Sequence, residues 1–222
     1  MDNWAGDARK FFSDDVSGET IEALYDIFKI SYAKLKERLG LSPDMNVLDL
    51  GCGNGALTGA IKKHVRKITG IDIAPGPLKI AEKKNPQNAF IMADMTDLPF
   101  NTEEFELIVS ITAIEFCCDR AGALKEAMRV LKPSGRLYLE VRNSAFPFRL
   151  RYPREGFYGL SYSDWKGLLE KEGFVIQNTF KSLRPSLYGS LTTRIKGLFN
   201  MLYSFLMPIR YHYIVGFLCV KR

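Results

Sequence analysis

Three glycines within the segment Val47–Gly55 form the most informative chemical pattern in the chain. The segment is VLDLGCGNG: an apolar run ends at glycines 51, 53 and 55, and a helix-like stretch follows. Glycines at a strand-to-helix turn let the backbone adopt positive φ and approach a ligand closely. The following helix presents unpaired N–H groups and the positive end of its dipole. The pattern therefore predicts a ligand-binding turn.

Two acidic residues follow the glycines at positions that suit a nucleoside. Asp72 ends a second strand-like run, 21 residues after Gly51, where a carboxylate can accept hydrogen bonds from both ribose hydroxyls. Asp94 follows a third such run, where it can accept a hydrogen bond from an adenine amino group while Met95 packs on the ring. Together these residues predict a site for an adenosine-containing cofactor.

The same glycines leave a second interpretation open. Gly51-x-Gly53-x-x-Ala56 satisfies the dinucleotide fingerprint, so an NAD-binding oxidoreductase is a competing class of protein. Asp49 argues against it, because a carboxylate just before the glycines would repel a pyrophosphate but attract an ammonium group. Asp94 adds an adenine contact that a dehydrogenase does not require. The two acids favour a cofactor that contains an amino acid.

The chain around these residues alternates strand-like and helix-like segments. We predict strands at 46–50, 67–73, 89–92, 105–111, 136–141, 174–180 and 211–220, and helices at 20–39, 56–64, 77–84, 120–131 and 161–172. Strands that alternate with helices indicate crossover connections and a parallel sheet covered on both faces. Right-handed crossovers then give a doubly wound α/β fold.

Four segments in order are similar to the motifs of class I S-adenosylmethionine (SAM)-dependent methyltransferases: Asp49–Gly55, Gly70–Ile73, Ala93–Phe100 and Arg129–Gly135. The resemblance covers roughly residues 45–173. It is especially close to the subgroup that includes ubiquinone and menaquinone C-methyltransferases and many small-molecule methyltransferases. It implies a Rossmann-like sheet of seven strands, mostly parallel, with an antiparallel last strand inserted beside the sixth.

The resemblance also implies which residues bind the cofactor. The turn residues would line the methionine part of SAM, the acid after the second strand would hold the ribose, and the acid after the third strand would hold the adenine. The end of the fourth strand would lie beneath the transferable methyl group. The residues in this order are Asp49, Gly51, Cys52 and Gly53, then Asp72 and Ile73, then Asp94 and Met95, and finally Ser110 and Ile111.

The chemistry of such an enzyme needs little from the protein beyond positioning. The sulfonium of SAM is already activated, so the protein must mainly hold the acceptor in line, about 3–3.5 Å from the methyl group. A base is needed only where the acceptor loses a proton. Glu115 is the one acid placed for that role, although we expect it to cap a helix or form a salt bridge. His64 and His212 are expected to be structural.

We expect one methyltransferase domain over residues 1–222, with three additions. A helical cap covers about 1–40, and its aromatic segment Trp4–Phe12 would close over the cofactor or pack on the domain. An aromatic insert covers about 143–162 and lies where acceptors enter. A basic amphipathic helix covers about 186–208; it would meet an anionic membrane, cover a lipid-like acceptor, or pack on its own sheet or a second subunit. The oligomeric state stays open.

Composition narrows the partners. The 31 Lys and Arg exceed the 25 Asp and Glu, which suits an anionic partner or simply keeps the protein soluble. The basic residues are scattered and no RNA-binding module is recognisable, so nucleic acid is not the expected partner. The four cysteines show no CxxC spacing, so we expect no metal site and a reduced, cytoplasmic location. Peripheral membrane contact through the C-terminal helix is one of the alternatives left open above. We expect neither a signal peptide nor a membrane-spanning segment.

The predicted function is transfer of a methyl group from SAM to a small-molecule acceptor, lipid-like or aromatic, with S-adenosylhomocysteine (SAH) as the product. Methylation of RNA or protein, NAD-linked oxidoreduction and SAM binding without catalysis are the alternatives.

Overall fold

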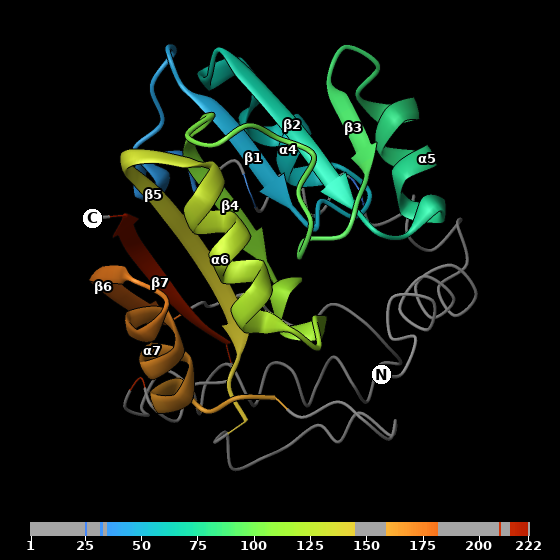
Figure 1. Cartoon of the computed structure of the whole chain (residues 1–222). Helices are drawn as coiled ribbons and strands as arrows, with labels where there is room; N and C mark the ends of the chain where they lie inside the picture. The colour runs from blue at the N-terminus through green and yellow to red at the C-terminus, as the bar shows by residue number, and fades with distance from the viewer. Residues whose placement is uncertain are drawn as a thin grey trace.

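A twisted β-sheet with helices on both faces forms the centre of the computed structural model shown in Figure 1. The structure describes Tyr25, Tyr32, residues 35–144 and 159–181, Ile209 and residues 214–221. The predicted lid segment, most of the aromatic insert, the amphipathic helix at 186–208 and His212 lie outside the described residues. Within the described part of the chain, no helix is both long and apolar enough to cross a membrane.

The sheet contains seven strands in the described residues: β1 (Asn46–Leu50), β2 (Lys67–Asp72), β3 (Ala89–Met92), β4 (Phe105–Ile111), β5 (Leu131–Arg142), β6 (Phe174–Lys181) and β7 (Ile214–Lys221). Their spatial order is β3-β2-β1-β4-β5-β7-β6. The first five pair in parallel, whereas β7 is antiparallel to both β5 and β6. The prediction of a doubly wound sheet with a late antiparallel strand beside the sixth is confirmed.

The described helical segments are α3 (Lys36–Leu39), α4 (Ala56–Ile61), η1 (Lys62–His64), α5 (Pro75–Lys84), η2 (Ile114–Phe116), α6 (Arg120–Val130) and α7 (Tyr162–Lys171). Most of the described boundaries that differ from the prediction differ by one residue, and two larger differences have physical reasons. Helix α5 starts two residues early because Pro75 suits the first helical turn, where its missing N–H is no loss. Strand β5 starts at Leu131 because that residue pairs with Phe105 of β4.

The central strands are buried on both faces. Val47, Leu107, Val109 and Tyr138 pack toward α3 and α4, together with Leu39, Leu57 and Ile61. Their neighbours along the strands pack on the opposite face against α6 and α7, where Leu124, Ala127, Trp165 and Leu169 are fully buried. Figure 1 shows α6 and α7 on the near face and α4 behind the sheet. The apolar run at residues 107–109 therefore lies in a central strand, as predicted.

Helix α7 begins at the residue that the sequence indicated. The Ser161 hydroxyl accepts a hydrogen bond from the Asp164 N–H, and the Asp164 carboxylate accepts one from the Ser161 N–H, forming a capping box. The helix ends before Gly173, whose φ of 92° suits glycine. These two ends set the position from which β6 enters the sheet.

Two glycines are expected to respond to alanine with opposite signs. A Cβ at Gly216 in β7 would lie 1.8 Å from the Phe180 ring, whereas a Cβ at Gly167 in α7 meets nothing within 4 Å. Gly216→Ala should therefore destabilise the fold by about 2 kcal/mol through overpacking. Gly167→Ala should stabilise it by about 0.5–1 kcal/mol through helix propensity. Urea unfolding of both variants tests this, and Phe180→Leu should partly rescue Gly216→Ala. Equal effects of the two alanines would contradict the packing described here.

Candidate cofactor site

The predicted site residues come together at the carboxyl edge of the sheet. Strand β1 lies between β2 and β4, so the chain order reverses there, and in such folds ligands bind at that point. Asp49 is level with Gly70 of β2 and with Val109 of β4, and Asp72 is level with Met92 of β3. The acidic residues at the carboxyl ends of β1, β2 and β3 therefore lie along one edge of the sheet.

The glycine turn has the conformation that its residues predicted. Gly51, Gly53 and Gly55 have φ values of 78°, 53° and 72°. A Cβ at Gly51 would lie 2.2 Å from the Ala113 Cβ, in the loop after β4, so this position must lack a side chain. A Cβ at Gly53 would meet nothing within 4 Å. The turn is therefore packed at Gly51 and open at Gly53, where a ligand has room to approach.

Asp72 holds the turn from the neighbouring strand. Its Oδ2 accepts a hydrogen bond of 2.8 Å from the Gly53 N–H, and its Oδ1 accepts one of 2.9 Å from the Ala74 N–H. Burial raises the pKa of the Asp72 carboxyl, and these two N–H donors oppose the rise. Each oxygen keeps a further lone pair for a ligand hydroxyl. The contact from Asp72 to the turn was not anticipated from the sequence.

Asp49 is almost completely buried, at 2% exposure. Its Oδ2 accepts a hydrogen bond of 2.7 Å from the Thr58 hydroxyl on α4. Burial raises the pKa of Asp49 to about 7; the Thr58 hydrogen bond opposes that rise, and the charge of Asp72 adds to it. Thr58 was missed in the sequence, where the only signal was a hydroxyl near the start of the helix after the turn. Asp49 is therefore poised to gain charge when a cation approaches.

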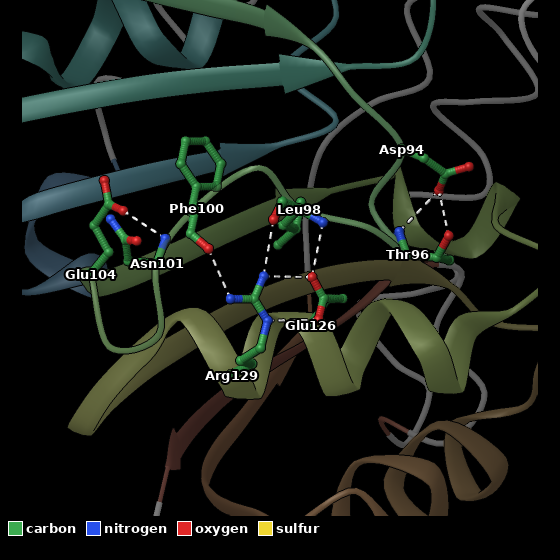
Figure 2. A network of polar contacts seen from close by, with 8 residues as sticks. All are labelled: Asp94, Thr96, Leu98, Phe100, Asn101, Glu104, Glu126 and Arg129. Atoms are coloured by element: carbon green, nitrogen blue, oxygen red, sulfur yellow. Dashed lines mark hydrogen bonds and ion pairs between the residues drawn. The ribbon is translucent and has the colours of Figure 1, made fainter.

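The loop after β3 brings the next two predicted residues to the same edge. The Asp94 Oδ1 accepts hydrogen bonds from the N–H and the hydroxyl of Thr96, at 2.9 and 2.8 Å. Figure 2 shows its other carboxylate oxygen pointing away from these donors. The Met95 Cε lies 3.9 Å from the position that a Gly51 Cβ would take, so this loop adjoins the glycine turn.

The carboxyl end of β4 carries an unpaired hydroxyl and a strained residue. Ser110 is fully buried, and its Oγ has no hydrogen-bond partner among the described residues. Thr112 has φ of 50°, which is unfavourable for a β-branched residue, and its N–H donates to the Glu140 carbonyl at 2.8 Å. Backbone strain of this kind is concentrated at functional sites. The strained turn directs the chain away from Ile111 into η2.

Glu115 forms the salt bridge that the sequence led us to expect. It is 1% exposed; its Oε2 accepts a 2.7 Å hydrogen bond from the Arg142 N–H, and its Oε1 lies 2.9 Å from the Arg142 Nε. Burial raises the pKa of Glu115, and the charges of Arg142 and Arg120 oppose the rise. Both carboxylate oxygens thus face Arg142, and the residue ties η2 to the end of β5.

A second buried acid, Glu140, was missed because it lies inside a predicted strand. It is 1% exposed and level with Ile111 of β4. The Tyr138 hydroxyl donates a 2.5 Å hydrogen bond to its Oε1, and burial and the charge of Glu140 both raise the pKa of Tyr138. The end of the fourth strand is therefore flanked by two buried carboxylates rather than one.

Comparison with known proteins agrees with this geometry. Residues 48–139 match a family described as a methyltransferase domain. A demethylmenaquinone methyltransferase of Tropheryma whipplei is 36% identical over 122 residues, 52% of this chain and 51% of the relative. A ubiquinone biosynthesis O-methyltransferase of Pseudomonas fluorescens is 25% identical over 202 residues, 86% of this chain and 80% of the relative. The chain spans about half the length of the first of these relatives.

Among solved structures, a SAM-dependent methyltransferase of Aquifex aeolicus has a TM-score of 0.66 at 18% identity, covering 93% of this chain and 99% of that one. These matches confirm the resemblance predicted from the sequence, together with the fold and SAM as the cofactor that the resemblance implies.

Removing the charge of Glu115 should destabilise the protein. Glu115→Gln removes the buried carboxylate charge that lies 2.9 Å from the Arg142 Nε, and loss of one partner of a buried pair costs about 3 kcal/mol. Glu170→Gln is the matched control, because Glu170 and Lys166 form an exposed pair at 3.8 Å that should contribute almost nothing. Chemical unfolding of both variants measures the difference. Equal stability of the two would contradict a structural role for the Glu115 pair.

Proposed function

We propose that this chain, whose central region is a class I SAM-dependent methyltransferase domain, transfers the methyl group of SAM to a small apolar acceptor, lipid-like or aromatic, and releases SAH. The observation that carries the proposal is the contact between the glycine turn and Asp72. A backbone N–H of the turn donates to a carboxylate that keeps free lone pairs, beside a glycine with open space above it. This arrangement suits a nucleoside whose sugar lies against the carboxylate.

Each residue at the edge fits one part of SAM. Ionised Asp49 would attract the ammonium group, and Gly53 leaves room for the chain of the amino acid. Asp72 would accept hydrogen bonds from the ribose hydroxyls, and the free oxygen of Asp94 would accept one from the adenine amino group. Ile73 and Met95 would flank the ring, with Cys52 beneath the turn. The buried Ser110 hydroxyl, together with Ile111, would face the reacting end of the cofactor.

The electrostatics favour SAM over a dinucleotide. Asp49 and Asp72 lie close enough for the charge of one to raise the pKa of the other. A pyrophosphate bound at this turn would add further negative charge in a poorly solvated site, where like charges repel strongly. A ligand with an ammonium and a sulfonium group relieves the same repulsion. The pair of acids thus supports a cationic ligand.

The mechanism that this site supports is direct displacement, in which the protein accelerates methyl transfer mainly by positioning the acceptor. Bound SAM supplies a methyl group on a sulfonium, which needs no further activation. The chain would contribute by holding the acceptor in line and excluding water. We infer that Glu115 holds η2 in place instead of acting as a base, because both of its oxygens face Arg142.

Two considerations support an apolar acceptor. The relatives named above carry quinone-type acceptors in their names. The sequence predicts an aromatic insert after β5 and an amphipathic basic helix at about 186–208, and both would suit a lipid-like molecule at a membrane surface. We therefore propose peripheral contact with an anionic membrane as the route by which the acceptor arrives. An acceptor screen should start with quinols and lipids.

Calorimetric titration with SAM, SAH and NAD tests the proposed cofactor. We expect micromolar binding of SAM and SAH and none of NAD. Asp72→Ala removes the two proposed hydrogen bonds to the ribose, together with the Gly53 hydrogen bond that holds the turn, and should weaken SAM binding at least roughly 100-fold. Glu82→Ala, on the exposed surface of α5, is the charge-matched control and should bind as the unaltered protein does. Binding of NAD alone would overturn the proposal.

The affinity for SAM should depend on pH through Asp49. The pKa of Asp49 is raised to about 7, so at a higher pH the carboxylate is ionised and attracts the ammonium group. At a lower pH the carboxyl group must first lose a proton, so the affinity for SAM falls by up to tenfold per pH unit. Titrations from about pH 6 to pH 8 should show this fall toward acid. Asp49→Asn should bind weakly with a flatter profile. Titration of SAM itself affects the unaltered protein and Asp49→Asn equally. Identical pH dependence of SAM affinity in the two proteins would therefore exclude Asp49 as the partner of the ammonium group.

A further inference from the structure

The loop between β3 and β4, residues 93–104, has no regular secondary structure, yet it carries Asp94 and Met95 to the site. The backbone polar groups of an irregular loop must find partners outside a helix or sheet ladder. Figure 2 shows where these partners come from: two side chains on one helix, Glu126 and Arg129 of α6, reach the middle of the loop. We call these two residues the α6 clamp.

The clamp binds both backbone groups of one loop residue. The Glu126 Oε2 accepts a hydrogen bond of 2.8 Å from the Leu98 N–H, and the Arg129 Nη2 donates to the Leu98 carbonyl at 2.9 Å. The Arg129 Nη1 donates to the Phe100 carbonyl at 2.8 Å. The two side chains also pair with each other, Nε to Oε1 at 2.8 Å and Nη2 to Oε2 at 2.7 Å. The planar guanidinium thus has its direction fixed before it meets the loop.

The strength of the clamp lies in its geometry. The side chains of Arg129 and Glu126 are 34% and 19% exposed, so the ion pair itself adds little stability. The pair instead determines the position of Leu98, whose side chain is buried in the same core cluster as Leu124, Ala127 and Val130 of α6. The loop continues along α6 beyond the clamp, because the Glu103 N–H donates to the Arg129 carbonyl and the Glu104 N–H to that of Val130.

Asp94 is linked to the clamp by a single tight turn. The Asp94 carbonyl accepts a hydrogen bond from the Asp97 N–H at 3.1 Å, and its carboxylate accepts two from Thr96. Leu98 is the next residue. A shift of Leu98 would therefore move the turn as a unit and carry the free oxygen of Asp94 with it.

We propose that Glu126 and Arg129 are positioning residues for base recognition: by fixing Leu98 they hold Asp94 where it selects a purine with a 6-amino group. The inference rests on the proposed function, since it concerns the adenine end of the same site. Neither residue touches the ligand. Loss of the clamp should therefore weaken recognition of the 6-amino group specifically and leave the contacts of the sugar and the amino acid in place.

The test compares SAH with S-inosylhomocysteine, in which a carbonyl replaces the 6-amino group. Unaltered protein should prefer SAH. Arg129→Met should weaken SAH binding about tenfold and change binding of the inosine analogue little, so the preference shrinks by about the same factor. Glu126→Gln should act in the same direction. Lys125→Met, an exposed cation on the same helix, is the matched control and should leave both affinities unchanged.

A double-mutant cycle separates positioning from general damage. Asp94→Asn should reduce the preference directly, and Arg129→Met added to it should cause little further loss, because both changes act through one contact. Arg129→Lys keeps the positive charge but not the planar guanidinium, so it should retain only part of the preference for SAH. It also replaces Arg129→Met in the test if a thermal scan shows that Arg129→Met does not fold. Equal weakening of both ligands, additive effects in the cycle, or an unchanged preference would each overturn the inference. If the unaltered protein binds no SAH, the proposed function itself fails, and the inference fails with it.

Discussion

The rest of the site depends on one hydrogen bond, from the Gly53 N–H to the Asp72 carboxylate. It joins the turn after β1 to the end of β2, and the N–H groups of Gly51 and Cys52 reinforce it by donating to the Ile71 carbonyl. With the turn held at these points, α4 starts at a fixed place and Thr58 meets Asp49. The position of the buried acid thus follows in part from contacts that another strand makes with the glycine turn.

Several features at this edge of the sheet lower the stability of the protein without a ligand. A buried carboxylate, Asp49, lies close to the partly buried Asp72, the Ser110 hydroxyl is buried without a partner among the described residues, and Thr112 has a left-handed backbone. Each feature carries a free-energy cost that an apolar core position would not have. Their presence together at this edge is consistent with preorganisation for a cationic, hydrogen-bonding ligand, since such a ligand would relieve several of these costs together.

The sequence could predict features that depend on local patterns and on the parallel sheet, but not contacts that depend on how the elements pack on one another. The strands at 89–92 and 105–111 were predicted to the residue, because short apolar runs between polar turns mark them locally. Asp49, Asp72 and Asp94 could be found because parallel strands bring their carboxyl ends to one edge. Thr58, Glu140 and the function of Arg129 could not, because those contacts depend on how α4, β5 and α6 lie on the sheet. Arg129 was visible only as part of a motif, with no sign that its guanidinium reaches Leu98 and Phe100, some 30 residues earlier.

Helix α6 shows how one rigid element can serve both sides of such a site. Its interior face is fully buried at Ala123, Leu124 and Ala127, so its position is set by the core. At its first turn, Arg120 donates to the Glu115 carbonyl and holds the segment after β4; at its last turn, Arg129 holds the loop after β3. Both loops that border the predicted cofactor site are thus held by side chains of a single packed helix. The distance between these two contacts is set by the length of that helix.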